Sequence, residues 1–167
     1  ADRYYEKARL QNNLLQQYKA LEKKTFLLPF NDAVSLLHQM HPLVQNIAND
    51  SIKGDFLNRS TVFYYDNRDF KNALYYAIAS VAFNEEINNL YNLNAVRITI
   101  ANIYHHTRYY DIAVVYFTQA KNYYQTQKDN NHLRGYVLTL YNLSRTYWQL
   151  QDVDKLTATI KESQQAI

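Results

Sequence analysis

The histidine pairs are the residues of this sequence that come nearest to a metal site in type and spacing. His105 and His106 are adjacent, and His38 and His41 are three positions apart. Adjacent residues of a helix point about 100° apart, and no cysteine or third ligand stands at a zinc-like spacing. The pair His38 and His41 could share a helical face, but no carboxylate stands close by. We therefore expect no metal site, and we interpret His105 and His106 as solvated residues at a helix end.

No other group of residues predicts catalysis. Glu85 and Glu86 are adjacent near an expected helix end, which gives a charged turn rather than a paired acid and base. The sequence has no Gly-rich phosphate loop, no nucleophile elbow and no Ser/His/Asp set. We expect a protein with no catalytic residues and no cofactor.

The composition favours a helical domain. Glycine and proline total four of 167 residues, which is few for a chain with many tight β-turns. The net charge is +3 and the charges alternate in sign, so we expect no nucleic-acid contact. No apolar run approaches the ~20 residues that span a bilayer, so we expect no membrane insertion. The absence of cysteine fits either a bacterial cytoplasm or a periplasm, and the localisation stays open.

The stretch from 98 to 120, ITIANIYHHTRYYDIAVVYFTQA, holds two amphipathic helical patterns joined by a very short link. One face of each pattern is apolar: Ile100, Ala101 and Tyr104 in the first, then Ala113, Phe117, Ala120 and Tyr124 in the second. The link from Arg108 to Asp111 leaves room only for a tight turn. The stretch therefore predicts an antiparallel helical hairpin, in which Ala101 and Ala113 let the two backbones approach closely.

The hairpin at 98–120 contains a residue pattern that occurs three times in the sequence. The pattern consists of a small residue, a tyrosine three positions later, an aromatic or apolar residue after the turn, and then an alanine. It is centred on Tyr104 and recurs around Tyr64 and, with Leu156 in place of the alanine, around Tyr147. These residues resemble the tetratricopeptide repeat, although 40 and 43 positions separate the tyrosines instead of the usual 34. Long repeats of this kind resemble those of bacterial regulatory proteins, including the sensor regions of membrane-anchored Bacteroidetes regulators.

The resemblance implies an all-α fold, a right-handed α-solenoid of about four antiparallel hairpins in one domain over residues 1–167. A regular up-and-down bundle is the alternative. We expect eight helices, of which the first runs from Arg3 to Lys24 and the second is kinked or split at Pro42. The expected caps or starts of the second to eighth helices are Asn31 or Asp32, Asp50 or Ser51, Asp69, Asn92 or Asn94, Tyr109 or Asp111, Asn131 and Asp152. The first residues are already helical in pattern, so we expect a part of a longer protein.

In tetratricopeptide repeats the first helix of each hairpin lines a concave groove. Counted from each repeat's tyrosine, the groove positions implied by the resemblance are Asn58, Val62, Tyr65, Asp66, Ile98, Asn102, His105, His106, Tyr141, Arg145, Trp148 and Gln149. Of these, we expect Asn58, Tyr65, Asn102, His105, Tyr141, Arg145 and Trp148 to bind the ligand. Asparagine pairs with backbone amides, arginine holds carboxylates, and aromatic rings supply contact area. The alternative is that all of them are ordinary exposed residues.

The family's carboxylate clamp uses lysine and asparagine at set positions. Asn102 matches one asparagine position, but Ile98 stands where lysine is expected. We therefore do not expect a C-terminal carboxylate to be bound in that manner.

These observations lead to two functional hypotheses. The first is a scaffold that binds a peptide or protein segment, as the sensor or interaction region of a bacterial regulatory protein. The second is a structural role in self-association, which would make the protein a homo-oligomer without a groove ligand.

Overall fold

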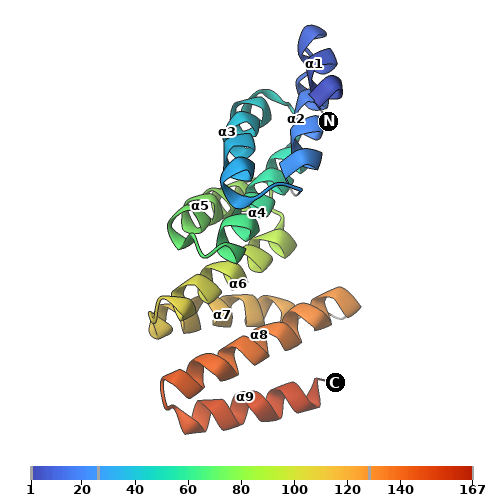
Figure 1. Cartoon of the computed structure of the whole chain (residues 1–167). Coiled ribbons are helices and arrows are strands. Elements are labelled where there is room, and N and C mark those ends of the chain that lie inside the picture. Colours follow the sequence, from blue (N-terminus) through green and yellow to red (C-terminus); the bar gives the residue numbers. More distant parts are fainter. Residues whose placement is uncertain (1, 26, 128, 167) are drawn as a thin grey trace. The chain divides into compact units, whose positions relative to one another are not determined.

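The computed structural model describes residues 2–25, 27–127 and 129–166 (Figure 1). Over these residues the chain is all-α, with nine helices and no strand, and the predicted fold class is confirmed. The helices are α1 (Asp2–Leu10), α2 (Leu14–Thr25), α3 (Phe30–Asn46), α4 (Asp50–Asp66), α5 (Phe70–Glu86), α6 (Leu90–His106), α7 (Tyr110–Gln125), α8 (Asn130–Gln149) and α9 (Val153–Gln165). None of the helices in the described ranges has the length and apolar character needed to cross a membrane.

The chain divides into two compact units, residues 1–60 and 61–167, and the boundary falls within α4. In the second unit each helix packs against the next, from α5 with α6 to α8 with α9, and α6 also contacts α8 (Figure 1). In the first unit α1 packs on α2 and α2 on α3. The prediction that residues 1–167 form a single repeat domain stays a prediction.

One recurring turn of three residues joins helices in the second unit. At the α6–α7 turn the carbonyl of Tyr104 accepts a hydrogen bond from the amide of Tyr109, and Arg108 has a left-handed φ of 68°. The carbonyls of Tyr64 and Tyr147 accept the same bond from the residue five positions later. Arg68 and Gln151 take the place of Arg108, with φ of 60° and 56°. The same turn also follows Asn84, between α5 and α6. The three tyrosines therefore hold the same position before this turn, as their repeated spacing predicts.

The core of the second unit lies between α6, α7 and α8. The predicted hairpin residues Ala101, Ala113, Phe117 and Ala120 are all 0% exposed there. The ring of Tyr104 stacks on Tyr116 of the next helix at 6.0 Å between centroids. Since a side chain as large as Phe117 is fully enclosed by two neighbouring helices, burial of apolar area fixes how these helices stack.

One prediction about the first unit is wrong, and one of the two alternatives for Pro42 is excluded. The expected helix from Arg3 to Lys24 is two helices, because Asn12 takes a left-handed φ of 50° and Asn13 caps α2 by accepting a hydrogen bond from the amide of Gln16. Of the two effects expected of Pro42, the split is absent, because α3 runs through this residue, and the kink stays a prediction. Pro42 and His38 are both exposed, so water can hydrate the His38 carbonyl that proline leaves without an amide partner.

Two predicted helix starts also shift. Helix α3 begins at Phe30, after Pro29, rather than after a cap at Asn31 or Asp32. Helix α6 begins at Leu90, because Asn89 rather than Asn92 accepts the capping hydrogen bond. The remaining starts lie within a residue or two of those predicted, since the capping side chains Asp69 and Asp152 act locally.

Candidate functional site

Helix α8 carries five exposed side chains along one line. They stand at positions i, i+4, i+7, i+11 and i+14, which share one face of a helix: Arg134, Leu138, Tyr141, Arg145 and Trp148. Tyr141 is 58% exposed and Trp148 is 69% exposed. We call these five residues the α8 stripe. Three of them are predicted groove residues, whereas Arg134 and Leu138 complete the line at the same helical spacing.

An open groove of ≈ 570 Å³ lies between the beginning of the α8 stripe and helix α6. Arg134 and Leu138 form its α8 side, and Thr99 and Asn102 belong to its α6 side. The Asn102 side chain is half-buried, so it can offer its amide to a ligand in the groove from a fixed position. Ile98 also borders the groove, but it is only 7% exposed and packs in the core instead of facing solvent as predicted.

A second hollow, of ≈ 330 Å³, lies at the other end of the α8 stripe. The predicted residues His105, Arg145, Trp148 and Gln149 line it. The structure thus places Asn102 in one hollow with Arg134 and Leu138, and His105 in the other with Arg145 and Trp148. Tyr141 lines neither hollow and stands between these residues on the same face of α8. Helices α6 and α8 belong to two successive hairpins.

The stripe is positively charged. The guanidinium of Arg145 lies 5.7 Å from the centroid of the Tyr141 ring. Burial lowers the pKa of His105 and of His106, and the Arg145 charge lowers both further, so both rings favour the neutral form. The electrostatic effect of the Arg145 charge therefore extends from α8 to the two histidines at the end of α6.

The two histidines link successive hairpins, which differs from the predicted solvated pair. His105 Nδ1 lies 3.0 Å from Thr146 Oγ1 of α8. That hydroxyl donates to the Asn142 carbonyl, so it accepts from His105, and Nδ1 carries the proton. His106 Nε2 lies 3.1 Å from the Tyr65 hydroxyl of α4. Each bond joins residues 41 positions apart, close to the 40 and 43 positions between the repeat tyrosines. The pair therefore links α6 to α8 and to the end of α4 that belongs to the second unit.

The other predicted positions are not part of this face. Tyr65 is half-buried and its hydroxyl lies against His106, and burial raises its pKa. Val62 and Asp66 are exposed at the end of α4. Asn58 is half-buried and belongs to the first unit, whereas the α8 stripe belongs to the second. Within the described ranges, no three His, Cys, Asp or Glu side chains come together as a metal site would require.

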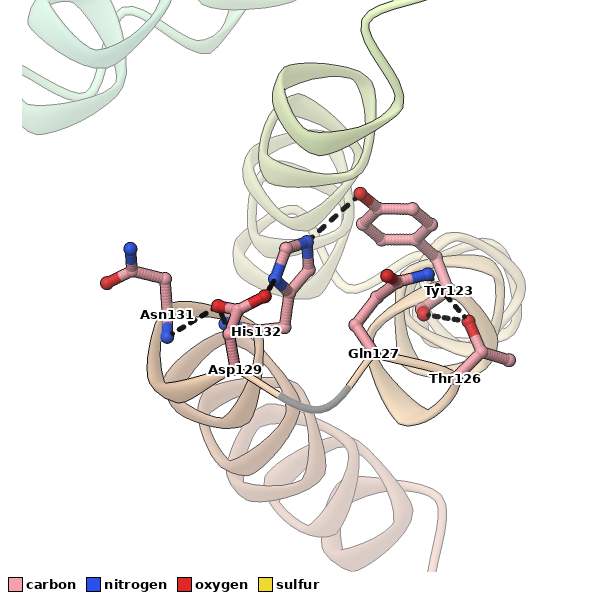
Figure 2. A network of polar contacts seen from close by, with 6 residues as sticks. All are labelled: Tyr123, Thr126, Gln127, Asp129, Asn131 and His132. Atoms are coloured by element: carbon pink, nitrogen blue, oxygen red, sulfur yellow. Dashed lines mark hydrogen bonds and ion pairs between the residues drawn. The ribbon is translucent and has the colours of Figure 1, made fainter.

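A polar network joins the end of α7 to the start of α8, beside the groove (Figure 2). Asp129 accepts hydrogen bonds from the amides of Asn131 and His132 and so caps α8, and it also accepts one from His132 Nδ1. His132 Nε2 then accepts from the Tyr123 hydroxyl of α7, at 3.1 Å. Figure 2 shows the Tyr123 and His132 side chains pointing toward each other from the two helices. The His132 ring also meets the Tyr91 ring of α6, at 5.3 Å between centroids.

Asp129→Ala tests whether this network holds the start of α8. It removes the cap of two backbone amides and the partner of His132, so we expect the melting temperature to fall by about 2–4 °C. Asn130→Ala is the matched control, because that neighbouring side chain is exposed and receives no capping bond. Thermal melts followed by circular dichroism measure both. Equal melting temperatures for the two variants would contradict a structural role for the network.

Comparison with known proteins identifies the fold. No protein-family model and no curated protein matches the sequence. The chain is similar to the crystal structure of BtubC (BKLC) from P. vanneervenii, with a TM-score of 0.70 and 16% sequence identity. The match covers 97% of this chain and 68% of that one. This chain has a helical-repeat fold. At such low identity the likeness extends to the fold alone, and membership of the tetratricopeptide family stays a prediction.

Proposed function

We propose that this chain is a scaffold that binds a peptide or protein segment, as the sensor or interaction region of a bacterial regulatory protein. The observation that carries the proposal is the α8 stripe, in which Tyr141 and Trp148 are more than half exposed. Other residues of the stripe line the open groove, and Trp148 lines the second hollow. Tyrosine, tryptophan and arginine are the residues that contribute most to protein interfaces.

The position of the stripe supports an elongated ligand. The two hollows lie at its two ends, and residues of α6 and α8 border both. A peptide in this groove would contact two successive hairpins at once. Binding would favour one spacing of the hairpins over others, and an attached effector would respond to that change.

Self-association is the second candidate, and α9 supplies the observation that favours it. Ile160 follows Tyr147 by the same 13 positions by which Phe117 follows Tyr104. Phe117 is fully buried, whereas Ile160 is 43% exposed and Val153 on the same helix is 66% exposed. A second copy that covered these side chains would bury apolar area as α8 does over Phe117.

Trp148 makes the peptide proposal testable, because it is the single tryptophan of the sequence. Peptides selected from a random library on the immobilised protein should shift its emission to shorter wavelength as they cover the ring. Tyr141→Ala should weaken their binding about tenfold, because a large interface ring is lost. Tyr75→Ala is the control, since Tyr75 is 60% exposed on α5, away from the stripe. Its affinity should equal that of the unmodified chain.

Sedimentation separates the two candidates. A chain that stays monomeric and binds the selected peptides supports the scaffold. A concentration-dependent dimer that Ile160→Glu abolishes, with no emission change on adding any selected peptide, would support self-association and overturn the scaffold.

A further inference from the structure

Two arginines of the α8 stripe form no ion pair with any residue that the structure describes. Arg134 and Arg145 are both exposed and both border a hollow of the groove. Among the residues that the structure describes, no aspartate or glutamate lines either hollow. The Arg145 guanidinium lies over the Tyr141 ring instead of against a carboxylate.

Basic side chains on the neighbouring helices do pair with acids. Lys121 of α7 binds Glu162 of α9 at 3.1 Å, and Arg97 of α6 lies 3.5 Å from Glu85 of α5. The lack of carboxylates is therefore a property of this face and not of the whole unit. An exposed guanidinium without a partner carries full charge and two parallel donors for a carboxylate or other anion.

The spacing of the two arginines sets the length of an anionic ligand. Eleven residues separate them, which is about 16 Å along a helix at ~1.5 Å per residue. An extended peptide rises ~3.3 Å per residue, and its side chains face one side at every second position. Side chains four positions apart then lie about 13 Å apart on the same side, and the flexible arginine side chains can close the difference. The side chain midway between them would lie over Leu138 and Tyr141.

We propose that the α8 stripe binds an extended acidic segment of a partner protein, with two carboxylate side chains four positions apart and an apolar side chain midway. Arg134 and Arg145 each bind one carboxylate, and Leu138 and Tyr141 contact the apolar side chain. This inference rests on the proposed peptide-binding function and names the chemistry of its ligand.

The probe is a short fluorescent peptide with two glutamates four positions apart and a phenylalanine between them. There are three comparison probes. The first is the same peptide with lysines in place of the glutamates, and the second has the two glutamates side by side. The third is single-stranded DNA of equal charge. Fluorescence anisotropy with the 167-residue chain at about 0.05 M and about 0.5 M salt measures each affinity. We expect the spaced acidic probe to bind most tightly, and about tenfold more tightly than the adjacent-glutamate probe.

The variants test the two contacts separately. Arg134→Ala and Arg145→Ala should each weaken the spaced probe about tenfold, and the double variant about a hundredfold, because sites this far apart act independently. Lys71→Ala is the control, since it removes a positive charge from an exposed position of α5 that lines neither hollow. Its affinity for the probe should be unchanged. Circular dichroism confirms that each variant is folded.

Three results would overturn the acidic-segment proposal: equal binding of the lysine probe, equal binding of the DNA, or equal losses in the arginine variants and in Lys71→Ala. If library-selected peptides still bind through Tyr141 while the acidic probe does not, the scaffold function stands and only this inference fails. If neither kind of peptide binds, both fail.

Discussion

Phe117→Ala is expected to lower the free energy of unfolding by about 3–5 kcal/mol. The Phe117 ring is 0% exposed in the cluster formed by α6, α7 and α8, which also contains Ile98 and Leu140. Its removal would lose the burial of the ring and leave a cavity that three packed helices cannot fully close. Urea denaturation followed by circular dichroism measures the loss.

Two further variants make the Phe117 result specific. Phe117→Leu keeps most of the apolar volume, so its cost should be below about 1.5 kcal/mol. Val115→Ala changes a residue of the same helix that is 54% exposed, and its effect should stay within about 0.5 kcal/mol. If Phe117→Ala cost no more than Val115→Ala, the core described for these helices would be wrong.

Gly135→Val is expected to destabilise the chain by about 2 kcal/mol, although valine normally suits a helix slightly better than glycine. A Cβ atom at position 135 would lie 2.8 to 2.9 Å from three ring atoms of Tyr124. That ring is 3% exposed, and it contacts the rings of Tyr91 and His132, so moving it away from a Cβ atom at position 135 would disturb these contacts. Glycine at this position lets α7 and α8 approach closely at the side of the groove.

A double substitution checks the cause. In a Tyr124→Leu background the ring is absent, so adding Gly135→Val should cost less than about 0.5 kcal/mol. Arg134→Val places the same side chain at the preceding, exposed position, and it should change stability by less than about 0.5 kcal/mol. Urea denaturation of the four variants measures the coupling. Equal costs of Gly135→Val in both backgrounds would exclude the contact with Tyr124 as the reason for the glycine.

Several features of the site could be predicted from the sequence because they follow from one helix alone. Tyr141, Arg145 and Trp148 stand at a helical spacing, so any helix there must place them on one face. Arg134 and Leu138 continue the same spacing toward the start of α8. The repeat resemblance implies groove positions only close to Tyr147, so it does not include these two residues. Ile98 shows that a position implied by the repeat pattern can still be buried. It packs in the core with residues of α7 and α8, although it also borders the groove.

The histidines show why long-range contacts were missed. As residues of one helix end, His105 and His106 have no feature that distinguishes them from solvated side chains. Their partners, Thr146 and Tyr65, each lie 41 positions away on a neighbouring first helix. Only the stacking of the repeats brings these groups together, so the bonds cannot be inferred from local pattern.

Most helices, the tight turn of the hairpin at 98–120 and the shared position of Tyr64, Tyr104 and Tyr147 could be predicted from local sequence, because capping, left-handed turn residues and helical period act within a few positions. Which helix faces are covered depends on the packing of the hairpins. The burial of Phe117, the close approach at Gly135 and the exposure of the α8 stripe with its unpaired arginines depend on how one hairpin packs on the next, and that packing is set by the summed apolar contacts of residues far apart in the chain.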